Sequence, residues 1–498
     1  MPPHRAWILA CGLAAVAVPF AAAYSSILNH FYRDGAYLLD SGLLAYLMTH
    51  ADLRQSMPPV LGGASFYGLH VSPVFSLLGA IAQALDAAPA AFFALFTGAC
   101  HALLAAGVFW ALTGPVGLRG WRAAPAALLA IGFSMSGLAI AVLRYPHFEM
   151  LIAAMAILFL VALHERRHGL AAVFLAVALN TREDAGFHVA ALLAVLVVAR
   201  RMLRMERAGE RVALCFLAVA FLYSAGVILV QALVSVGESS FARIYSGMPP
   251  YQHLHPGLVA ERLLGWLMLR GYAILPILVA LGWAILRRRP LVLVGYASTL
   301  PWLALHLTAL AVLPGTLSSY YAFPLVIASF WPLLGALPEG RRAGPAEQRE
   351  IAAGFLLMIA ATFTAFPAQH NPNGTSVAAM FAPPPSREVR NGIDHAIETV
   401  ARSRAALGTV LIDDGVAALA PDAFRPGNLL WNNPDGQADT VVYFRGAYLA
   451  DEARSRAERL GLAREYRLAG TPVHIATSRD LERVPDLKDL VEPVSGRR

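Results

Sequence analysis

Acidic, basic and imidazole side chains recur at the ends of the apolar segments of this chain. Asp34 and Asp40 lie in FYRDGAYLLDSG, and His70 opens the segment HVSPVFSLL. Further along, His147 and Glu149 stand close together in YPHFEM. Ionisable groups at the edge of an apolar segment usually face a cavity or a partner. Residues of these types could act as a general base, bind a metal ion or hold a polar substrate.

Six further polar residues complete the candidate set. In chain order they are Arg182, Glu183, Asp184, Arg243, Tyr320 and Tyr321. Acids also favour the start of a helix, so a capping role competes with a functional one for Glu183 and Asp184. For the two tyrosines, the competing interpretation is an aromatic belt at a membrane surface.

The composition decides what kind of element must position these residues. Of the 498 residues, 57% are hydrophobic and 14% are charged, and the mean hydropathy is +0.56. Soluble globular proteins carry about 25% charged residues. Apolar runs recur from Trp7 to about Ala368, so much of the chain must lie in lipid. This excludes a cytosolic enzyme, a nucleic-acid-binding protein and a secreted disulfide scaffold.

Eleven segments are candidate transmembrane helices, given that a span needs about 20 apolar residues. They are 7–25, 88–113, 123–143, 148–163, 168–181, 186–199, 211–236, 264–286, 291–314, 320–337 and 351–368. Three of them are short, which leaves the count open by two. A cytoplasmic N-terminus places every arginine cluster on the cytoplasmic side, as the positive-inside rule requires. This topology needs the segment 71–85 to be interfacial or re-entrant, and it exports the C-terminus.

The two ends of the chain differ from its middle. The N-terminus fits a cleaved signal peptide or an uncleaved first helix, and we favour the uncleaved helix because the segment is long enough to span. Residues 370–385, rich in Pro and Asn, predict a linker. Beyond the linker, helical patterns alternate with short apolar strands. These strands are expected near 408–414, 440–444 and 472–476.

The expected organisation is therefore an all-α polytopic membrane protein with a small α/β domain at its C-terminus. The transmembrane domain covers 1–369 and includes a long first exported loop at 26–87, and the soluble exported domain covers 386–498. With this topology, the candidate residues all fall on the exported side of the membrane. Their convergence from five separate loops favours one functional site.

Five motifs in order resemble a bacterial integral membrane family, domain of unknown function two-thousand-and-seventy-nine. They are YLLDSGLLAY, HVSPVFSLL, YPHFEM, LNTREDAGF and SYYAFP, and the resemblance covers about residues 25–330. Members carry an Asp-small-Gly turn, a His-x-Ser-Pro segment, a Phe-His-Pro-Glu-like motif and a Lys-Glu-Asp motif. Here His147 precedes Phe148, Arg182 replaces the lysine, and the usual Gln and Trp after the first Asp-Gly are missing. Arg182 keeps the charge but changes the donor geometry.

That family is grouped with the GT-C-type glycosyltransferases, which take a sugar from a polyprenyl-phosphate carrier on the exported face. The resemblance implies a GT-C-like fold, the bacterial inner membrane as location, and membrane lipid and a polyprenyl-phosphate-linked sugar as partners. Asp40 is the expected general base, with Asp34 second. Arg182 and Arg243 are expected to hold the lipid phosphate.

The remaining candidates are assigned to substrate and metal binding. Glu149, Glu183 and Asp184 could hold a divalent cation, Mg²⁺ or Mn²⁺, or orient the sugar. His70 and His147 could assist them as hydrogen-bond partners or ligands. Some GT-C enzymes need a divalent ion and others do not, so the metal stays open.

Two other functions compete with the transferase. A transporter or flippase of lipid-linked sugar would place ionisable groups near the midplane on broken helices and often shows repeated halves. Here the charges lie at helix ends, and the sequence shows no internal repeat. A non-catalytic envelope assembly protein, whose exported domain binds a partner, is the third interpretation.

Overall fold

The computed structural model shows a chain that is 70% helical, with a small sheet near the C-terminus. It describes residues 3–50, 52–143, 145–205, 209–234, 241–317, 319–337, 342–364 and 381–494. The chain divides into two compact units. The first contains 1–21, 67–74 and 97–368, and the second contains 22–66, 75–96 and 369–498.

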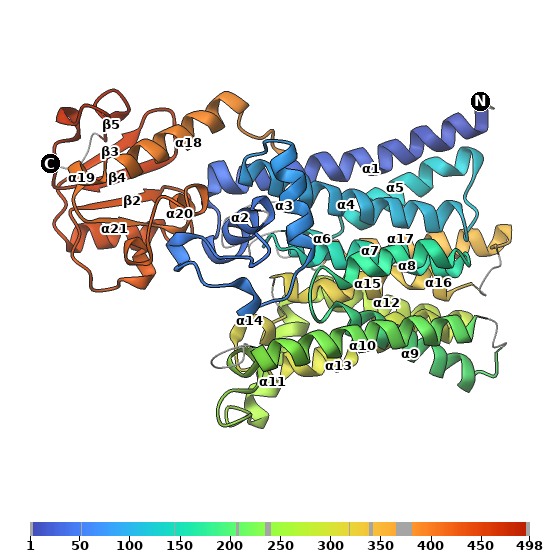
Figure 1. Ribbon diagram of the computed structural model, residues 1–498. Helices are drawn as coiled ribbons and strands as arrows, with labels where there is room; N and C mark the ends of the chain where they lie inside the picture. Colours follow the sequence, from blue (N-terminus) through green and yellow to red (C-terminus); the bar gives the residue numbers. More distant parts are fainter. Residues whose placement is uncertain are drawn as a thin grey trace. The chain divides into compact units, whose positions relative to one another are not determined.

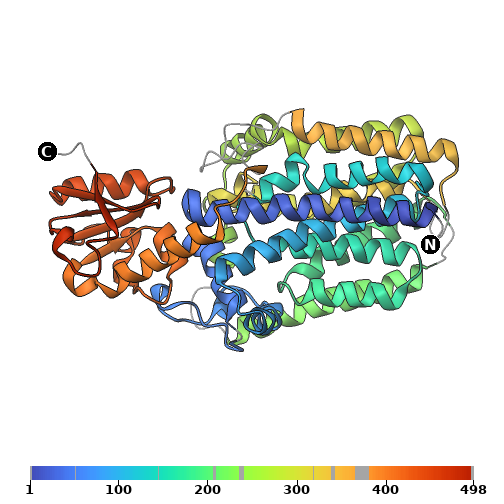
Figure 2. The ribbon, with the colours of Figure 1, turned by 90° about the horizontal axis from the view of Figure 1, so that it is seen from above.

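The first unit is a bundle of helices that run side by side (Figures 1 and 2). Each helix satisfies its backbone hydrogen bonds internally, as lipid requires. Long runs of Ala, Leu and Val give these helices apolar side chains. In chain order the helices are α1 (Pro3–Asn29), α4 (Pro89–Thr113), α5 (Ala123–Ser134), α6 (Gly137–Leu143), α7 (Glu149–His164), α8 (His168–Leu179), α9 (Ala185–Met202), α10 (Glu210–Val234), α11 (Pro256–Leu269), α12 (Gly271–Arg287), α13 (Val294–Leu307), α14 (Val312–Gly315), α15 (Phe323–Phe330), α16 (Pro332–Gly335) and α17 (Pro345–Thr364). α1 and α4 have residues in both units.

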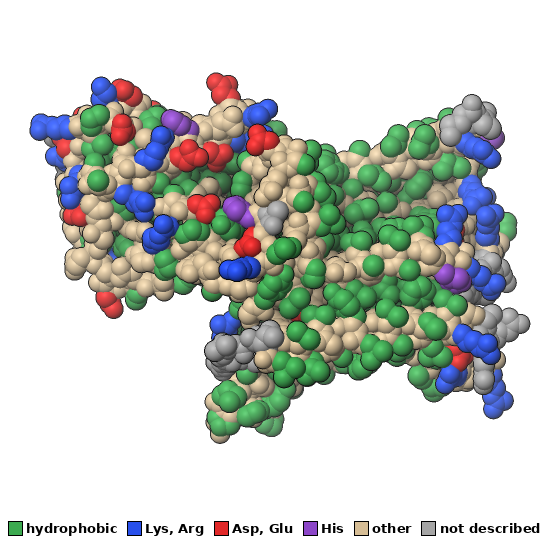
Figure 3. Space-filling model, in the orientation of Figure 1, with side chains coloured by type: hydrophobic (Ala, Val, Ile, Leu, Met, Phe, Trp, Pro, Cys, Tyr) green, Lys and Arg blue, Asp and Glu red, His purple; other side chains and the backbone are tan. Residues whose placement is uncertain are grey.

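The surface of this bundle is apolar along the helices and basic at one end. Figure 3 shows hydrophobic side chains over the long helices of the first unit and Lys and Arg gathered at one end of them. In α10, only 17% of the most apolar window is buried, and Leu233 is 76% exposed. So large an exposed apolar surface is unfavourable in water and favourable in lipid.

The expectation of eleven spans is wrong. Among the described residues, five helices are long and apolar enough to cross a membrane. They are His4–Gly35, Pro89–Thr113, Ala185–Met202, Glu210–Leu233 and Pro290–Leu307. The number rises to seven if two bent pairs each count as one span. These pairs are α5 with α6, bent by 44°, and α11 with α12, bent by 83°.

The other expected spans are short or interrupted. α7 has 16 residues and α8 has 12, which is about 24 and 18 Å of helix against a hydrocarbon core of about 30 Å. The expected span 320–337 divides into α15 and α16 where Pro332 begins a new helix, because proline cannot continue the hydrogen-bond ladder. The expected span 351–368 corresponds to α17, and its residues 365–368 lie outside the described part of the chain.

A five-stranded sheet lies in the second unit, with strand order β1-β2-β4-β3-β5 (Figure 1). The strands are β1 (Val410–Ile412), β2 (Thr440–Phe444), β3 (Arg464–Leu468), β4 (Val473–Thr477) and β5 (Val491–Pro493). β1 and β2 are parallel, with Leu411 opposite Val441, and the other pairs are antiparallel. A parallel pair needs a crossover, and the helix α20 (Asp414–Leu419) lies within this one.

Helices complete the second unit. They are α2 (Leu43–Thr49), α3 (Val74–Ala84), α18 (Arg387–Arg402), α19 (Arg404–Leu407), α20 and α21 (Ala450–Arg459). α21 packs through Ala453 and Ala457 on Val441 and Tyr443 of β2, because small residues let helix and sheet approach closely. α3 has 11 residues, about 16 Å, and is too short to cross a membrane.

The segment after α1 folds together with the C-terminal residues inside this second unit. Tyr32 donates a hydrogen bond of 3.0 Å from Oη to Oδ2 of Asp394. Gly42 lies so close to α20 that a Cβ atom there would be 2.7 Å from the Cβ of Ala418. The acidic segment that carries Asp34 and Asp40 is therefore built against the last part of the chain. Of the expected linker, residues 370–380 lie outside the described residues.

Candidate functional site

Eight of the eleven predicted site residues, all except Asp34, Asp40 and Arg243, come together in the first unit. Four segments bring them there, namely 67–74, the turn before α7, the turn between α8 and α9, and the turn Ser319–Ala322. α7 and α8 pack against each other, so the start of α7 lies beside the end of α8. This pairing places Glu149, the first residue of α7, next to Arg182.

Arg182 is the centre of the charged contacts. Its Nε donates to Oδ1 of Asp184 and its Nη2 donates to Oδ2, each at 2.6 Å, while its Nη1 donates to Glu149. The guanidinium lies 5.5 Å from the ring centre of Phe323. Burial opposes ionisation of Asp184, but the charge and hydrogen bonds of Arg182 outweigh it and lower the pKa of Asp184 to about 2. Asp184 is thus an ionised anchor and a poor general base.

His147 is the second hydrogen-bond partner of Glu149, beside Arg182. Because an ionised carboxylate only accepts hydrogen bonds, His147 donates from Nδ1 to the Oε2 of Glu149, which is fully buried. Burial, and then the positive charge of Arg182, hold the pKa of His147 well below its usual range. The neutral imidazole stacks on Tyr320, with ring centres 4.0 Å apart and an angle of 15° between the planes.

Glu183 links the segment 67–74 to the turn between α8 and α9 through two hydrogen bonds. Its Oε1 accepts a hydrogen bond of 2.8 Å from Nδ1 of His70, and its Oε2 accepts one of 2.9 Å from the Val71 backbone. The side chain of His70 is 30% exposed, whereas that of Glu183 is 11% exposed. The side chain of His70 is therefore more accessible than that of Glu183.

Aromatic and imidazole rings join the charged residues into a closed circuit. His188 of α9 lies 3.9 Å from Asp184, and its ring is 4.6 Å from Trp302 of α13. The circuit continues through His306 and Tyr321 and returns to His147 through the stacked pair of Tyr321 and Tyr320. We call these nine residues the polar ring: His147, Glu149, Arg182, Asp184, His188, Trp302, His306, Tyr320 and Tyr321.

Four buried nitrogens of the polar ring lack hydrogen-bond partners among the described residues. They are Nε2 of His188, Nε1 of Trp302, and both Nδ1 and Nε2 of His306. Buried polar atoms in proteins are nearly always hydrogen bonded, and each one left unpaired costs about 1–3 kcal/mol. Unpaired nitrogens concentrated in one place make the polar ring the candidate functional site of this unit.

The sequence did not single out His188, Trp302 or His306. Each lies within an apolar helix, where polar groups are costly and often functional. A spacing signal was present: His188 follows Asp184 by four residues and His306 follows Trp302 by four, so each pair shares one helix face. Only the packing of α9 against α13 brings the two pairs together.

Three predicted residues lie elsewhere. Asp34 and Asp40 belong to the second unit, in the turns 30–35 and 38–42, and both side chains are partly exposed. Arg243 lies in the turn 242–246 of the first unit with an exposed side chain, and its neighbour Tyr245 is 5.9 Å from the ring of His306.

The carboxylates proposed as metal ligands face protein partners. Glu149 contacts Arg182 and His147, Asp184 contacts Arg182, and Glu183 contacts His70. Within the described residues, no group of three or more His, Cys, Asp or Glu side chains is placed to hold a metal ion. The metal assignment stays a prediction.

No family model matches this chain. Comparisons with curated proteins and with solved structures likewise find no match. The resemblance to a GT-C-related family therefore rests on the sequence motifs alone. What the site can do chemically has to be argued from its own charges and unpaired groups.

The charges of the site favour neutral or cationic ligands over phosphate. Two carboxylates, of Glu149 and Asp184, contact the guanidinium of Arg182, and a third, of Glu183, contacts His70. The polar ring thus holds two carboxylates for one guanidinium. The donors of Arg182 already bind two of these carboxylates, so the site suits a ligand rich in hydroxyl groups.

Proposed function

We propose that this chain is a GT-C-type glycosyltransferase of the bacterial inner membrane, which takes a sugar from a polyprenyl-phosphate carrier on the exported face. The observation that carries the proposal is the polar ring with its four unpaired nitrogens. It lies in a chain whose longest helices are apolar enough to span a membrane. Sugar hydroxyls both donate and accept, so they can satisfy imidazole and indole nitrogens together.

The sugar and the phosphate of the carrier are proposed to bind to different residues. The net negative polar ring suits the sugar, and its aromatic faces add apolar contact area. The phosphate needs a cation whose donors are not already used. Arg182 is bound by Asp184 and Glu149, so the proposal shifts phosphate binding toward Arg243, whose side chain is exposed.

The reaction itself needs a base. The bond between the anomeric carbon and the phosphate oxygen breaks, the acceptor oxygen forms the new bond, and the acceptor proton moves to a carboxylate. Asp40 is the proposed base and Asp34 the second choice, because the resemblance implies an essential acid in the first exported loop. Asp184 has too low a pKa for this role. The phosphate leaves on the polyprenyl chain with the electrons of the broken bond.

Lipid mass spectrometry tests the proposal directly. Wild type, Asp40→Asn and the control Asp86→Asn are reconstituted in lipid and given a panel of polyprenyl-phosphate sugars, with membrane extract as acceptor. Asp86 is an exposed loop residue at φ +48°, a conformation that asparagine adopts readily. We expect wild type and Asp86→Asn to consume one carrier, and Asp40→Asn to be at least about 100-fold slower.

A second candidate function is a flippase of lipid-linked sugar. Broken helices such as the pair α11 and α12, bent by 83°, are typical of transporters. If no carrier is consumed and fluorescent lipid-linked sugars cross the bilayer faster with protein present, the flippase replaces the transferase. If neither occurs, the chain is a non-catalytic assembly protein.

A further inference from the structure

A large basic cavity lies in the first unit, at the opposite end of α7 from the polar ring. Its volume is about 690 Å³, within the usual range for small-molecule sites. Glu149 begins α7 and belongs to the polar ring, while His164 ends α7 and lines the cavity. Fifteen residues of helix separate the two, which is about 22 Å. The cavity is therefore a separate site.

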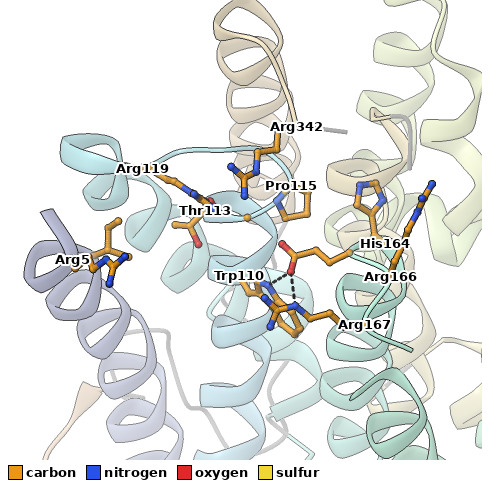
Figure 4. Close-up of a pocket in the computed structure, with 12 residues that line it drawn as sticks. Arg5, Trp110, Thr113, Pro115, Arg119, His164, Arg166, Arg167 and Arg342 are labelled. Carbon is orange, nitrogen blue, oxygen red and sulfur yellow. Dashed lines mark hydrogen bonds and ion pairs between the residues drawn. The ribbon is translucent and has the colours of Figure 1, made fainter. Parts of the chain in front are cut away.

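Five arginines line this cavity, and they come from four separate segments of the chain (Figure 4). They are Arg5, Arg119, Arg166, Arg167 and Arg342. Among the described lining residues the one carboxylate is that of Glu165, which accepts a hydrogen bond of 3.0 Å from Nε1 of Trp110 and forms an ion pair of 3.3 Å with Arg167. Arg167 therefore neutralises Glu165, and the described part of the lining keeps four arginines without a carboxylate partner.

Most of the remaining guanidinium groups have no partner among the described residues. Arg119 donates from Nε to the carbonyl oxygen of Thr113 at 2.9 Å. The side chains of Arg5, Arg166 and Arg342 form no hydrogen bond or ion pair with any residue that the structure describes. Arg166 also has φ +60°, a conformation that glycine usually occupies at a helix end. An arginine at this position is tolerated despite the backbone strain.

The wall of the cavity holds a buried polar atom as well. His164 is 9% exposed, and its Nε2 has no hydrogen-bond partner within the described chain. Such an atom is costly to bury unless a bound molecule pairs with it. His164 is thus an unpaired buried polar residue in the lining, beside the arginines.

Guanidinium groups bind phosphate oxygens through paired, charge-assisted hydrogen bonds. We propose that this cavity binds a phosphate-bearing anion, either an anionic lipid head group or a soluble phosphate compound, through Arg5, Arg166, Arg342 and His164. Ile8 of α1 also lines the cavity, and only 28% of the apolar window of α1 is buried. An acyl chain attached to the anion has apolar helix surface to follow.

Two binding experiments with the purified full-length protein distinguish the sources. Isothermal titration in neutral detergent uses inorganic diphosphate as the soluble probe. Native mass spectrometry uses phosphatidylglycerol as the lipid probe, with phosphatidylcholine as the zwitterionic comparison. We expect at least one anion to bind, and Arg166→Gln/Arg342→Gln to weaken that binding by about tenfold or more.

The matched control is Arg287→Gln/Arg288→Gln, which removes the same charge from exposed arginines that do not line the cavity. It should bind within about twofold of wild type, because surface charge acts weakly at physiological salt. Equal losses in both double variants, or no anion binding by wild type above the phosphatidylcholine level, would overturn the proposal. If the cavity variant does not fold, Arg5→Gln at the exposed start of α1 replaces it.

Discussion

Arg182 and Asp184, two residues apart in the turn between α8 and α9, face each other through two parallel hydrogen bonds of 2.6 Å. This fork-to-fork geometry is the strongest arrangement open to an arginine and a carboxylate. Both side chains are largely buried, and Glu149 binds the third edge of the same guanidinium. The turn is therefore fixed in shape before any ligand arrives.

Removing the cation should unfold this turn. We expect Arg182→Gln to lower the free energy of unfolding by about 3–5 kcal/mol, because it leaves Glu149 and Asp184 buried without a counter-charge. Arg182→Lys should lower the free energy of unfolding by less, since lysine keeps the positive charge and loses only the paired hydrogen bonds. Urea denaturation in detergent measures both, and Arg243→Gln, at an exposed position, should stay within about 0.5 kcal/mol of wild type. If Arg182→Gln lowered the free energy of unfolding only slightly, the two carboxylates would have to be protonated.

Removing unpaired nitrogens from the polar ring should make the protein more stable and weaken substrate binding. His306→Phe keeps an aromatic ring and removes two buried nitrogens that lack partners. Stability should therefore rise by about 1 kcal/mol, while the KM for a polyprenyl-phosphate sugar should rise about tenfold.

Thermal melting and carrier consumption together check the His306→Phe prediction. His101→Phe is the matched control, because Nδ1 of this buried histidine is hydrogen bonded to the Ser134 carbonyl at 2.9 Å. The control should lower stability and leave KM unchanged. A less stable His306→Phe with wild-type KM would remove the main support for the transferase.

A close backbone approach in the second unit predicts a steric effect. Gly42→Ala would place a Cβ atom 2.7 Å from the Cβ of Ala418 and 3.1 Å from its Cα. We expect a loss of about 1–3 kcal/mol, because α20 must shift. Gly392→Ala in α18 is the control: it meets nothing within 4 Å and should be neutral or stabilising by up to about 1 kcal/mol. Equal melting temperatures for the two variants would contradict this packing.

Asp413 should make the second unit more stable in mild acid. Its fully buried carboxylate accepts hydrogen bonds of 2.9 Å from the backbone N–H groups of Val416 and Phe444. Burial raises the pKa of Asp413 to about 7, although these two bonds oppose the shift. The folded state then binds the proton more tightly than the unfolded state, whose pKa is about 3.9.

The sign of the pH dependence follows from this linkage. The contribution of Asp413 to stability is full below about pH 4, is lost as the pH rises to about 7, and is constant above that. Pulse proteolysis in urea at several pH values measures the change in the full chain, expected on the order of 3 kcal/mol. In Asp413→Asn this part of the slope should disappear. An unchanged slope would assign the titration to another group.

Some of the fold could be predicted from local patterns. The strands expected near 408–414, 440–444 and 472–476 are present as β1, β2 and β4, because each is a short apolar run buried on both faces. β3 was not predicted: its sequence REYRL is mostly polar, and only Tyr466 and Leu468 are buried. Its pairing with β4 is a tertiary contact that local composition does not show.

The span count failed for a related reason. Hydropathy measures how apolar a segment is and does not show where a helix breaks. Arg270 ends α11 and precedes α12, yet both helices are apolar enough to read as one segment. In the candidate site, Arg182, Glu183 and Asp184 were found by their residue types, whereas His306 needed the packed helices to reveal it.

The partnership between the start and the end of the chain has a consequence for biosynthesis. Tyr32 hydrogen bonds to Asp394, which is 362 residues away. At about 5–20 residues per second, the ribosome makes the second residue on the order of 20–70 seconds after the first. Throughout that interval Gly42 has no Ala418 to pack against. The segment with Asp34 and Asp40 is thus among the first to be made and among the last to reach its final shape.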